Sequence, residues 1–353
     1  MNYSIDSFIV RIPLSKVKIA DSELNQSILR ISKETGECLN EERITRKYVE
    51  TGKGVKVTFQ VKTIRDKVRG RYKYSTYLVI KCTSKLLKER YFEGINHSTI
   101  YKYWEALQAL NVAHFSFDVF MRASITDLDI KRDFRLEPTE YKALIESLKV
   151  LAKPSIYQAQ GIKFFNQKGN TGIQFSARET ATPANPYLKI YNKKTELEVR
   201  STEFRNTYLR DVDLENLYRF EFTLKNAKHM KMYEIEPNNL ANFMHLFIFD
   251  EEQGRIQRMA KDIWNKHVNP IQPTVSTEKE SSLKRVYLKT IPLLLAQNYP
   301  KSWIVEHFTN DMDRAGRSRH KKIIEECFSE VEGKNPSLKD RKIDQILERI
   351  GVA

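Results

Sequence analysis

The feature that most constrains the fold of this chain is a series of short segments in its first 270 residues in which apolar and polar side chains alternate. Alternation with a period of two residues is typical of strands that bury one face. The segments with this pattern cover residues 7–14, 54–64, 76–82, 126–136, 161–166, 171–177, 186–192 and 218–226. They predict a large sheet.

Helix-like periodicity separates several of these strands. It is clearest over 98–111, where Ser98 is placed to cap the helix, and over 137–153, where Pro138 suits the first turn. A further helix is expected from Pro237 toward His267, with a break. Interleaved helices and strands of this kind predict an α+β protein with a mainly antiparallel sheet and flanking helices.

The C-terminal part of the chain has a different character. A polar segment with two prolines, NPIQPTVSTEKESS (269–282), reads as a linker, and helix-like segments follow at 282–298, 318–333 and 337–351. We therefore expect three regions, 1–115, 116–270 and 271–353, of which the last is a small helical domain.

Composition points to a polyanionic partner. The 353 residues include 60 Lys and Arg against 45 Asp and Glu, a formal net charge of +15, which favours nucleic acid. A membrane is not expected as a partner, because no apolar run reaches the roughly 18 residues of a spanning helix and no signal-peptide pattern is visible. The cysteines Cys38, Cys82 and Cys327 are too scattered to suggest a zinc site or disulfides, which fits the cytoplasm.

The segment 186–192 carries two tyrosines on one face. Strand alternation places Tyr187, Lys189, Tyr191 and Lys193 together, opposite an apolar face. Four residues at about 3.3 Å each separate the two phenols by roughly 13 Å, so at most one of them is expected to be the primary nucleophile.

Two other predicted strands also have a polar face. One carries Asp129 and Asp133, and the other carries Glu221. If the three faces meet, the site holds a phenol, carboxylates that suit Mg²⁺ or Mn²⁺, and several cations, a combination that suits phosphoryl transfer at DNA. The alternatives are a solvated tyrosine, a solvated acidic edge strand and a cross-strand ion pair at Glu221.

These segments resemble the gene II replication initiators of filamentous bacteriophages and, more distantly, the rolling-circle plasmid initiators of Gram-positive bacteria. The resemblance covers most of the first 230 residues and rests on the order and spacing of five stretches. They are IDSFIVRIPL (5–14), YLVIKCTSKLLKERYFEGIN (77–96), ITDLDIKRDF (125–134), NPYLKIYNKKTEL (185–197) and YRFEFTLKN (218–226).

The resemblance implies a role for each matched position. In that family the tyrosine that opens the YLK stretch, here Tyr187, cuts one strand of the origin and becomes joined to the 5′ phosphate. Asp133 and Glu221 would bind the metal or support its ligands, and Lys189 is the lysine of the same stretch. Supporting roles for Asp129, Tyr191 and Glu196 rest on parity and proximity.

One pattern of the wider class of rolling-circle initiators is missing from the sequence. Many of those proteins bind their metal through two histidines that flank a hydrophobic residue, and none of the seven histidines here has that spacing. We interpret His114 as a core or sheet histidine. The two families that the chain resembles also lack the pair.

Two basic stretches are candidate DNA contacts. The hairpin-like segment 61–77 alternates cations with tyrosines, and RAGRSRHKK (314–322) is a cationic cluster. The alternatives are a solvated ribbon and the polar face of a helix. The residues expected to contact DNA are Arg65, Lys67, Arg69, Arg71, Lys73, Lys193, Arg317 and Arg319.

The sequence therefore favours a rolling-circle replication initiator, a metal-dependent nickase and rejoining enzyme that acts on origin DNA in a bacterial cytoplasm. Region 1–115 would bind DNA and region 116–270 would carry catalysis. The resemblance implies a host helicase and a single-strand-binding protein as partners, with possible self-association. The rival interpretations are a non-enzymatic origin-binding initiator or repressor, a relaxase for plasmid mobilisation, and an RNA-binding protein.

Overall fold

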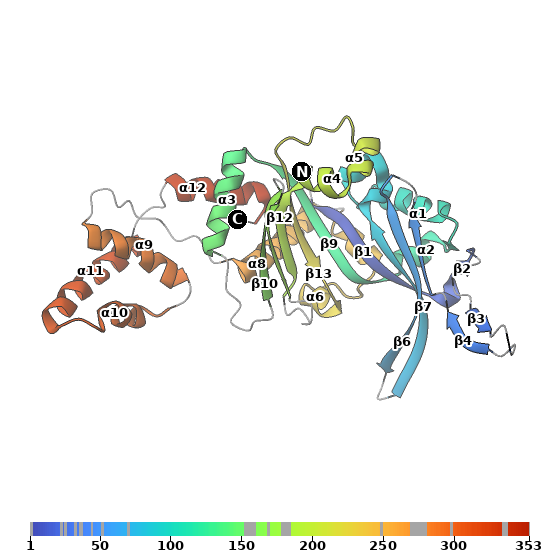
Figure 1. The fold of residues 1–353 in the computed structure, drawn as a ribbon, viewed down its shortest axis with the longest axis horizontal. Coiled ribbons are helices and arrows are strands. Elements are labelled where there is room, and N and C mark those ends of the chain that lie inside the picture. Colours follow the sequence, from blue (N-terminus) through green and yellow to red (C-terminus); the bar gives the residue numbers. More distant parts are fainter. Residues whose placement is uncertain are drawn as a thin grey trace.

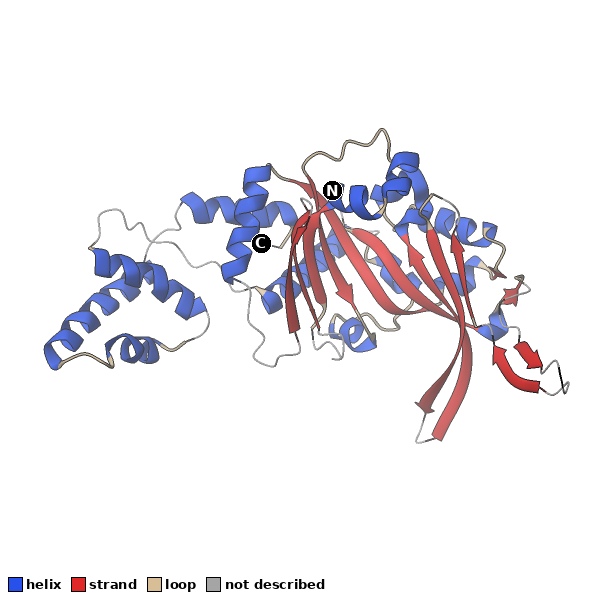
Figure 2. Cartoon of the chain, viewed as in Figure 1, coloured by secondary structure: helices blue, strands red, loops and turns tan. Residues whose placement is uncertain are grey.

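The computed structural model describes residues 3–21, 24, 27–31, 34, 38–43, 45–50, 53–68, 71–151, 160–167, 170–177, 185–247, 250–268, 281–296, 299–333 and 338–352. Its centre is one antiparallel sheet with the strand order β10-β11-β12-β13-β9-β1-β7-β6-β5 (Figures 1 and 2). The strands are β1 (Ser4–Pro13), β5 (Arg46–Glu50), β6 (Lys56–Val68), β7 (Arg71–Thr83), β9 (Ser124–Arg135), β10 (Gln160–Gln167), β11 (Asn170–Ala177), β12 (Tyr187–Asn192) and β13 (Leu217–Leu224). All eight predicted strands belong to this sheet, which confirms the expected α+β class.

Two short ribbons lie outside the large sheet. They pair β2 (Lys18–Ile19) with β8 (Ala113–His114), and β3 (Ser27–Ile31) with β4 (Cys38–Arg43). These four strands and β5 were not anticipated from the sequence.

Helices flank the sheet, and the three helical segments predicted before residue 270 correspond to α1, α3 and the pair α7 and α8. The helical elements up to there are the 3₁₀ helices η1 (Leu14–Lys16) and η2 (Ser84–Glu93), and α1 (Ile100–Ala109), α2 (Phe117–Met121), α3 (Pro138–Leu151), α4 (Lys193–Arg200), α5 (Thr202–Tyr208), α6 (Ala227–Met232), α7 (Leu240–His245) and α8 (Asp250–His267). Across the described ranges, no helix combines the length and the apolarity that crossing a bilayer requires.

The two faces of the sheet are covered differently. On the apolar face, Phe8 of β1 packs against Tyr103 of α1, and Tyr141 of α3 stacks on Tyr218 of β13 with ring centroids 3.8 Å apart. On the polar face, η2, α4 and α5 cover only one end. There Phe204 of α5 meets Tyr91 of η2 edge-on, with centroids 5.4 Å apart.

The C-terminal helices divide between two cores. Helices α9 (Ser282–Ala296), α10 (Lys301–Thr309) and α11 (Arg314–Gly333) form a lobe with a hydrophobic core of its own, set apart from the sheet in Figure 1. Helix α12 (Leu338–Ile350) instead joins the core of the sheet domain. Most of the predicted linker, residues 269–280, lies outside the described residues.

Contacts at the end of α12 fix it to the sheet domain. The hydroxyl of Tyr3 donates to the carbonyl oxygen of Gly351 at 3.2 Å, and Arg349 forms a 2.8 Å ion pair with Glu140 of α3. The lobe is therefore followed, as well as preceded, by parts of the chain that pack on the sheet domain.

Candidate active site

The three polar faces identified in the sequence lie side by side, because β12, β13 and β9 are neighbours in the sheet. The register aligns Lys189 with Glu221, and Tyr187 with Thr223. On the other side of β13, Thr223 is aligned with Asp129. Cross-strand neighbours on one face are close enough to interact, so these residues form a single site.

Glu221 lies at the middle of this face and is buried. Its carboxylate accepts hydrogen bonds from Lys189 Nζ at 2.6 Å and from the Tyr191 hydroxyl at 3.0 Å. Burial raises the pKa of the Glu221 carboxyl, and the neighbouring carboxylate of Asp129 adds to the rise in spite of the ion pair with Lys189. Glu221 is thus a buried anion whose negative charge is only partly offset.

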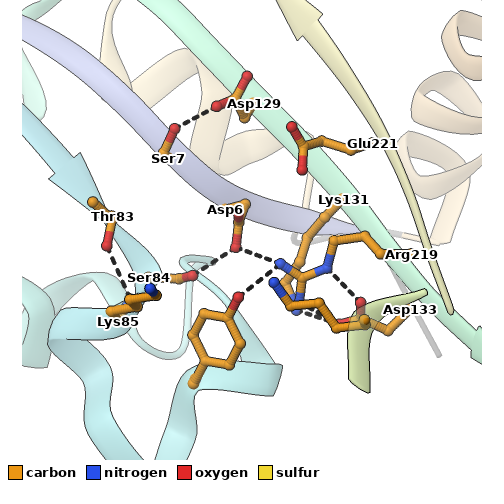
Figure 3. A network of polar contacts seen from close by, with 12 residues as sticks. Asp6, Ser7, Thr83, Ser84, Lys85, Asp129, Lys131, Asp133, Arg219 and Glu221 are labelled. Atoms are coloured by element: carbon orange, nitrogen blue, oxygen red, sulfur yellow. Dashed lines mark hydrogen bonds and ion pairs between the residues drawn. The ribbon is translucent and has the colours of Figure 1, made fainter. Parts of the chain in front are cut away.

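Asp129 is held by hydroxyl groups. Ser7 Oγ donates to one carboxylate oxygen at 2.5 Å (Figure 3). Thr223 Oγ1 donates to the other oxygen, also at 2.5 Å. No ion pair to Asp129 occurs among the described residues. Hydroxyl donors orient the carboxylate without cancelling its charge, and a second carboxylate, Glu221, lies diagonally across the strand pair.

Arg219 is the centre of a buried hydrogen-bond network next to Glu221 on β13. It is fully buried, and it donates to Asp133 through Nε at 2.6 Å and Nη2 at 3.0 Å. Its Nη1 donates to Asp6 at 2.8 Å and to the Tyr91 hydroxyl at 2.9 Å. Lys131 Nζ donates to the same Asp133 carboxylate at 2.6 Å (Figure 3). Both oxygens of Asp133 therefore face cations.

This network has electrostatic consequences for its members. Burial alone would raise the pKa of Asp133, but the Arg219 guanidinium and the Lys131 ammonium hold it below its ordinary value. Burial, with the nearby positive charge of Arg219, lowers the pKa of Lys131 to about 8. Asp133 thus supports the site by fixing Arg219 and Lys131.

Asp6 is a site residue that the sequence interpretation missed. Strict alternation along β1 would place it with Phe8 on the apolar face, but the register shifts between Ile5 and Ser7, which indicates a bulge. The bulge turns Asp6 to the polar side, where it meets Arg219 and accepts from Ser84 Oγ at 2.8 Å. The sequence feature that could have identified Asp6 is an acidic residue at a position where alternation predicts an apolar side chain.

The two tyrosines of β12 differ in their surroundings. Tyr191 donates its hydroxyl to Glu221, and burial together with that carboxylate raises the pKa of Tyr191 well above its ordinary value. Tyr187 is half-buried, and no hydrogen bond to its hydroxyl occurs within the described ranges. Lys225 Nζ lies 5.4 Å from the Tyr187 ring centroid and forms a 2.7 Å ion pair with Asp127. Within the described ranges, Tyr191 is thus the one of the two phenols whose hydroxyl is bonded to a carboxylate.

Lys193, expected to contact DNA, is buried at the start of α4. It forms a 2.6 Å ion pair with Glu196 and lies 5.5 Å from the ring centroid of Tyr191. Glu196 is half-buried on the first turn of α4. The pair of Lys193 and Glu196 therefore lies beside Tyr191.

Two carboxylates on this face are candidate ligands for a metal ion. Among the described residues, no group of three or more His, Cys, Asp or Glu side chains is arranged to hold a metal ion. Mg²⁺ is commonly bound by one or two protein carboxylates, with phosphate oxygens and water completing its shell. Asp129, which has no ion pair among the described residues, and Glu221, whose charge Lys189 offsets only in part, fit that requirement, whereas Asp133 is already bonded to two cations.

The predicted hairpin contacts fall at the far end of β6 and β7. These two strands pair from Thr58↔Lys81 to Val68↔Arg71, and their paired ends extend beyond the rest of the sheet in Figure 1. Arg65 is exposed on β6. Arg69 lies outside the described residues, as do the side chains of Lys67, Arg71 and Lys73.

The remaining candidates lie away from the active site. Arg317 and Arg319 are exposed on α11 of the C-terminal lobe. His114 lies in the small β8 strand, with Nε2 3.0 Å from Asn111 Oδ1. The structure therefore brings Tyr187, Glu221 and Asp129 together and leaves the basic residues of the lobe in a separate place.

The chain has a structural likeness to known proteins but no match at the level of sequence. No family model and no curated protein matches the sequence. Among solved structures, the chain is similar to a rolling circle replication initiator protein from Geobacillus stearothermophilus, with 10% sequence identity and a TM-score of 0.34. The alignment covers 84% of this chain and 97% of that one.

Proposed function

We propose that this protein is a rolling-circle replication initiator that cuts and rejoins one strand of origin DNA through Tyr187. The observation that carries the proposal is the contrast between the two phenols on β12. Tyr187 is half-buried beside the cation of Lys225, whereas the hydroxyl of Tyr191 is bonded to the buried carboxylate of Glu221. A phenol that must attack phosphorus has to reach the DNA.

The electrostatics of the polar face support phosphoryl transfer. Asp129 and Glu221 would hold a divalent cation, which when bound would polarise the scissile phosphate. Lys189 on β12 and Lys225, the residue that follows β13, add cations to this face, where phosphate groups would approach. The excess of cations over the whole chain attracts DNA.

The reaction conserves the number of phosphate ester bonds. The Tyr187 oxygen attacks phosphorus, a bond forms between them, and the bond from phosphorus to the 3′ oxygen breaks. The phenol loses a proton and the departing 3′ oxygen gains one. The 5′ phosphate remains joined to Tyr187, so the reverse attack by a 3′ hydroxyl can rejoin the strand without another energy source.

The residues around the nucleophile have positioning roles. Arg219 and Asp133 fix the centre of the sheet, and the hydroxyls of Ser7 and Thr223 orient Asp129. Lys189 holds Glu221 at 2.6 Å. The sequence resemblance to the filamentous-phage initiators supports the same assignment of the nucleophile.

The proposal is tested with single-stranded DNA. Purified protein is incubated with a labelled pool of random single strands and Mg²⁺ or Mn²⁺, and adducts that survive denaturation are collected and sequenced. The wild type and Tyr191→Phe should form an adduct with strands that share a sequence, and Tyr187→Phe should form none. Binding of DNA should change little in Tyr187→Phe, because the variant loses only one hydroxyl.

Two further variants separate chemistry from folding. Asp129→Ala and Glu221→Ala should lower adduct formation more than they lower DNA binding. An adduct in Tyr187→Phe, or its loss only in Tyr191→Phe, would overturn the assignment. A wild type that binds DNA but never forms an adduct would favour a non-enzymatic initiator.

The proposed role also implies partners. A nick with a free 3′ hydroxyl needs a helicase that unwinds the duplex and a protein that covers the displaced strand. We infer that the host supplies both. Initiators that hold two DNA ends can act in more than one copy, and self-association belongs to the same proposal.

A further inference from the structure

The polar face of the sheet continues past the proposed active site, across β1, β7, β6 and β5. Alternate residues of these strands are buried, as Val57, Phe59 and Val61 are in β6, and the residues between them are half-buried or exposed. Ser7 of β1 belongs to the second set and bonds to Asp129 of the site. The proposed active site is therefore one part of a larger polar surface.

Four cations lie on this surface, one on each strand, and we call them the basic face. They are Arg11 of β1, which is half-buried, and Lys81 of β7, Lys62 of β6 and Arg46 of β5, which are exposed. The register places them on the same side of the sheet. Arg11 aligns with Val79, two residues before Lys81, and Val79 aligns with Gln60, two residues before Lys62. Gln60 aligns in turn with Arg46.

The positive charge of the basic face is not offset by acids of the chain. Within the described ranges, none of its four cations forms an ion pair. The acids at its margins are paired with other lysines, Glu50 with Lys56 at 3.4 Å and Asp127 with Lys225 at 2.7 Å. Lysines on an edge strand commonly serve to prevent aggregation, but here the cations continue inward to β7 and β1. They therefore need another explanation.

The spacing of these cations suits duplex DNA. Neighbouring strands lie about 4.8 Å apart, so β1 and β5 are separated by about 14 Å, close to the width of about 12 Å of the major groove. Arg11 and Arg46 can thus reach phosphates on the two sides of one groove. Lys62 aligns with Tyr77, about 13 Å along β7 from Lys81. The basic face extends in two directions, as the phosphates of a duplex do.

The exposed tyrosine of this surface is already bonded to a neighbour. The ring centroid of Tyr48 lies 5.8 Å from the guanidinium carbon of Arg46, and its hydroxyl accepts from Arg46 Nη1 at 2.9 Å. Proteins that hold single strands present aromatic rings on which unpaired bases stack. Cations beside polar side chains such as Thr58 and Gln60 suit a sugar-phosphate backbone better.

We propose that the basic face binds the duplex that flanks the nick, with its four cations contacting phosphates of both strands. The proposal rests on the proposed function for the presence of DNA on this side of the sheet. It adds a surface that holds the uncut part of the DNA while one strand reaches Tyr187. Five strand spacings separate β12 from β6, about 24 Å, which corresponds to about seven base pairs.

The test measures binding of a fluorescent duplex, two turns long and of arbitrary sequence, by anisotropy without divalent cations at several salt concentrations. Lys62→Gln should reduce the slope of log K against log salt by about 0.9, the value for one phosphate contact on a duplex. If both proteins bind alike at 1 M salt, this slope gives about an eightfold loss of affinity at 0.1 M. The double variant Arg46→Gln, Lys62→Gln should lose about 1.8 in slope and about 60-fold in affinity.

Two controls separate charge from other effects. Lys261→Gln removes an exposed lysine from α8, which packs on the opposite face of the sheet, where His267 lies 5.1 Å from Phe175 of β11. It should leave affinity and slope near the wild-type values. Lys62→Arg keeps the charge and should bind like the wild type. A loss in Lys62→Arg as large as in Lys62→Gln would overturn the proposal.

A single strand of the same length tests the alternative occupant. The double variant should weaken duplex binding by a larger factor than single-strand binding. An equal or larger loss for the single strand would place that strand on the basic face and overturn the proposal, as would unchanged duplex affinity and slope. The adduct at Tyr187 is not needed for these measurements, so failure to form it would refute the nicking proposal and leave the binding result intact.

Discussion

Asp133→Asn removes the carboxylate to which both Arg219 and Lys131 are bonded. Asp133 is buried and accepts three charge-assisted hydrogen bonds, at 2.6 and 3.0 Å from Arg219 and at 2.6 Å from Lys131. Removing one partner of a buried ion pair costs about 3–5 kcal/mol, because a charge is left uncompensated. Arg219 keeps Asp6 and Tyr91, so we expect about 3 kcal/mol, the lower end of that range.

The loss should depend on pH through Lys131. Its pKa is about 8 in the folded protein and about 10.5 in the unfolded chain, so the unfolded chain binds more protons between these values and stability rises with pH there. Without Asp133 the folded pKa falls further and the window extends below pH 8. The destabilisation by Asp133→Asn should therefore be larger at pH 6 than at pH 9, by about 1.4 kcal/mol for each unit of additional pKa shift.

Urea unfolding of the wild type and the variant at pH 6, 7.5 and 9 measures both effects. Asp213→Asn, which removes an exposed acid paired with Arg135, is the matched control and should change stability little. The double variant Asp133→Asn, Lys131→Met should lose the pH dependence. If Asp133→Asn were as stable as the wild type at pH 6, the buried network would not hold the sheet as described.

Two further predictions concern the C-terminal part of the chain. Ile346→Ala on α12 should destabilise the sheet domain by about 2–5 kcal/mol, whereas Ile291→Ala should destabilise only the lobe. Residue-resolved hydrogen exchange measures both effects, and loss of protection in the lobe of Ile346→Ala would contradict the placement of α12. Gly351→Ala should lower the melting temperature, because Gly351 has a φ of +87° and an added Cβ would lie 1.8 Å from Arg132 Nη1. Gly254→Ala, inside α8 and without a close neighbour, is the control and should be neutral or stabilising. Equal changes of melting temperature in the two variants would refute the argument.

Strand alternation made much of the sheet predictable from the sequence. A period of two is a local property, so the polar faces of β9, β12 and β13 could be assigned without knowing their partners. Tyr187, Asp129 and Glu221 follow from that assignment. The antiparallel pairing of these strands through β13 then brings the three side chains together.

Other features depend on contacts that local patterns do not specify. The bulge that turns Asp6 toward Arg219 lies just before the predicted strand 7–14, so alternation within that strand gives no information about Asp6. The apolar stripe of α12 predicts that it packs, but not that it packs on the sheet domain rather than on the lobe. The burial of Lys193 follows from α4 folding back over the sheet, and its basic side chain looks like a DNA contact when only the sequence is considered.

The two tyrosines of β12 show where the sequence stops being informative. Both lie on the same face and both are close to lysines, so strand alternation gives no basis for choosing one of them as the nucleophile. The distinction comes from the hydroxyl of Tyr191, which lies 3.0 Å from a Glu221 oxygen. That contact depends on the register between two strands about 30 residues apart.

The most direct test of the account is to locate the covalent bond by tryptic digestion of the trapped adduct and mass spectrometry. Trypsin cuts after Lys189, so Tyr187 falls in the peptide 179–189 and Tyr191 in the peptide 190–193. The account predicts a nucleotide on the peptide 179–189. A nucleotide on 190–193 or elsewhere, or none although the strand has been cut, would contradict it.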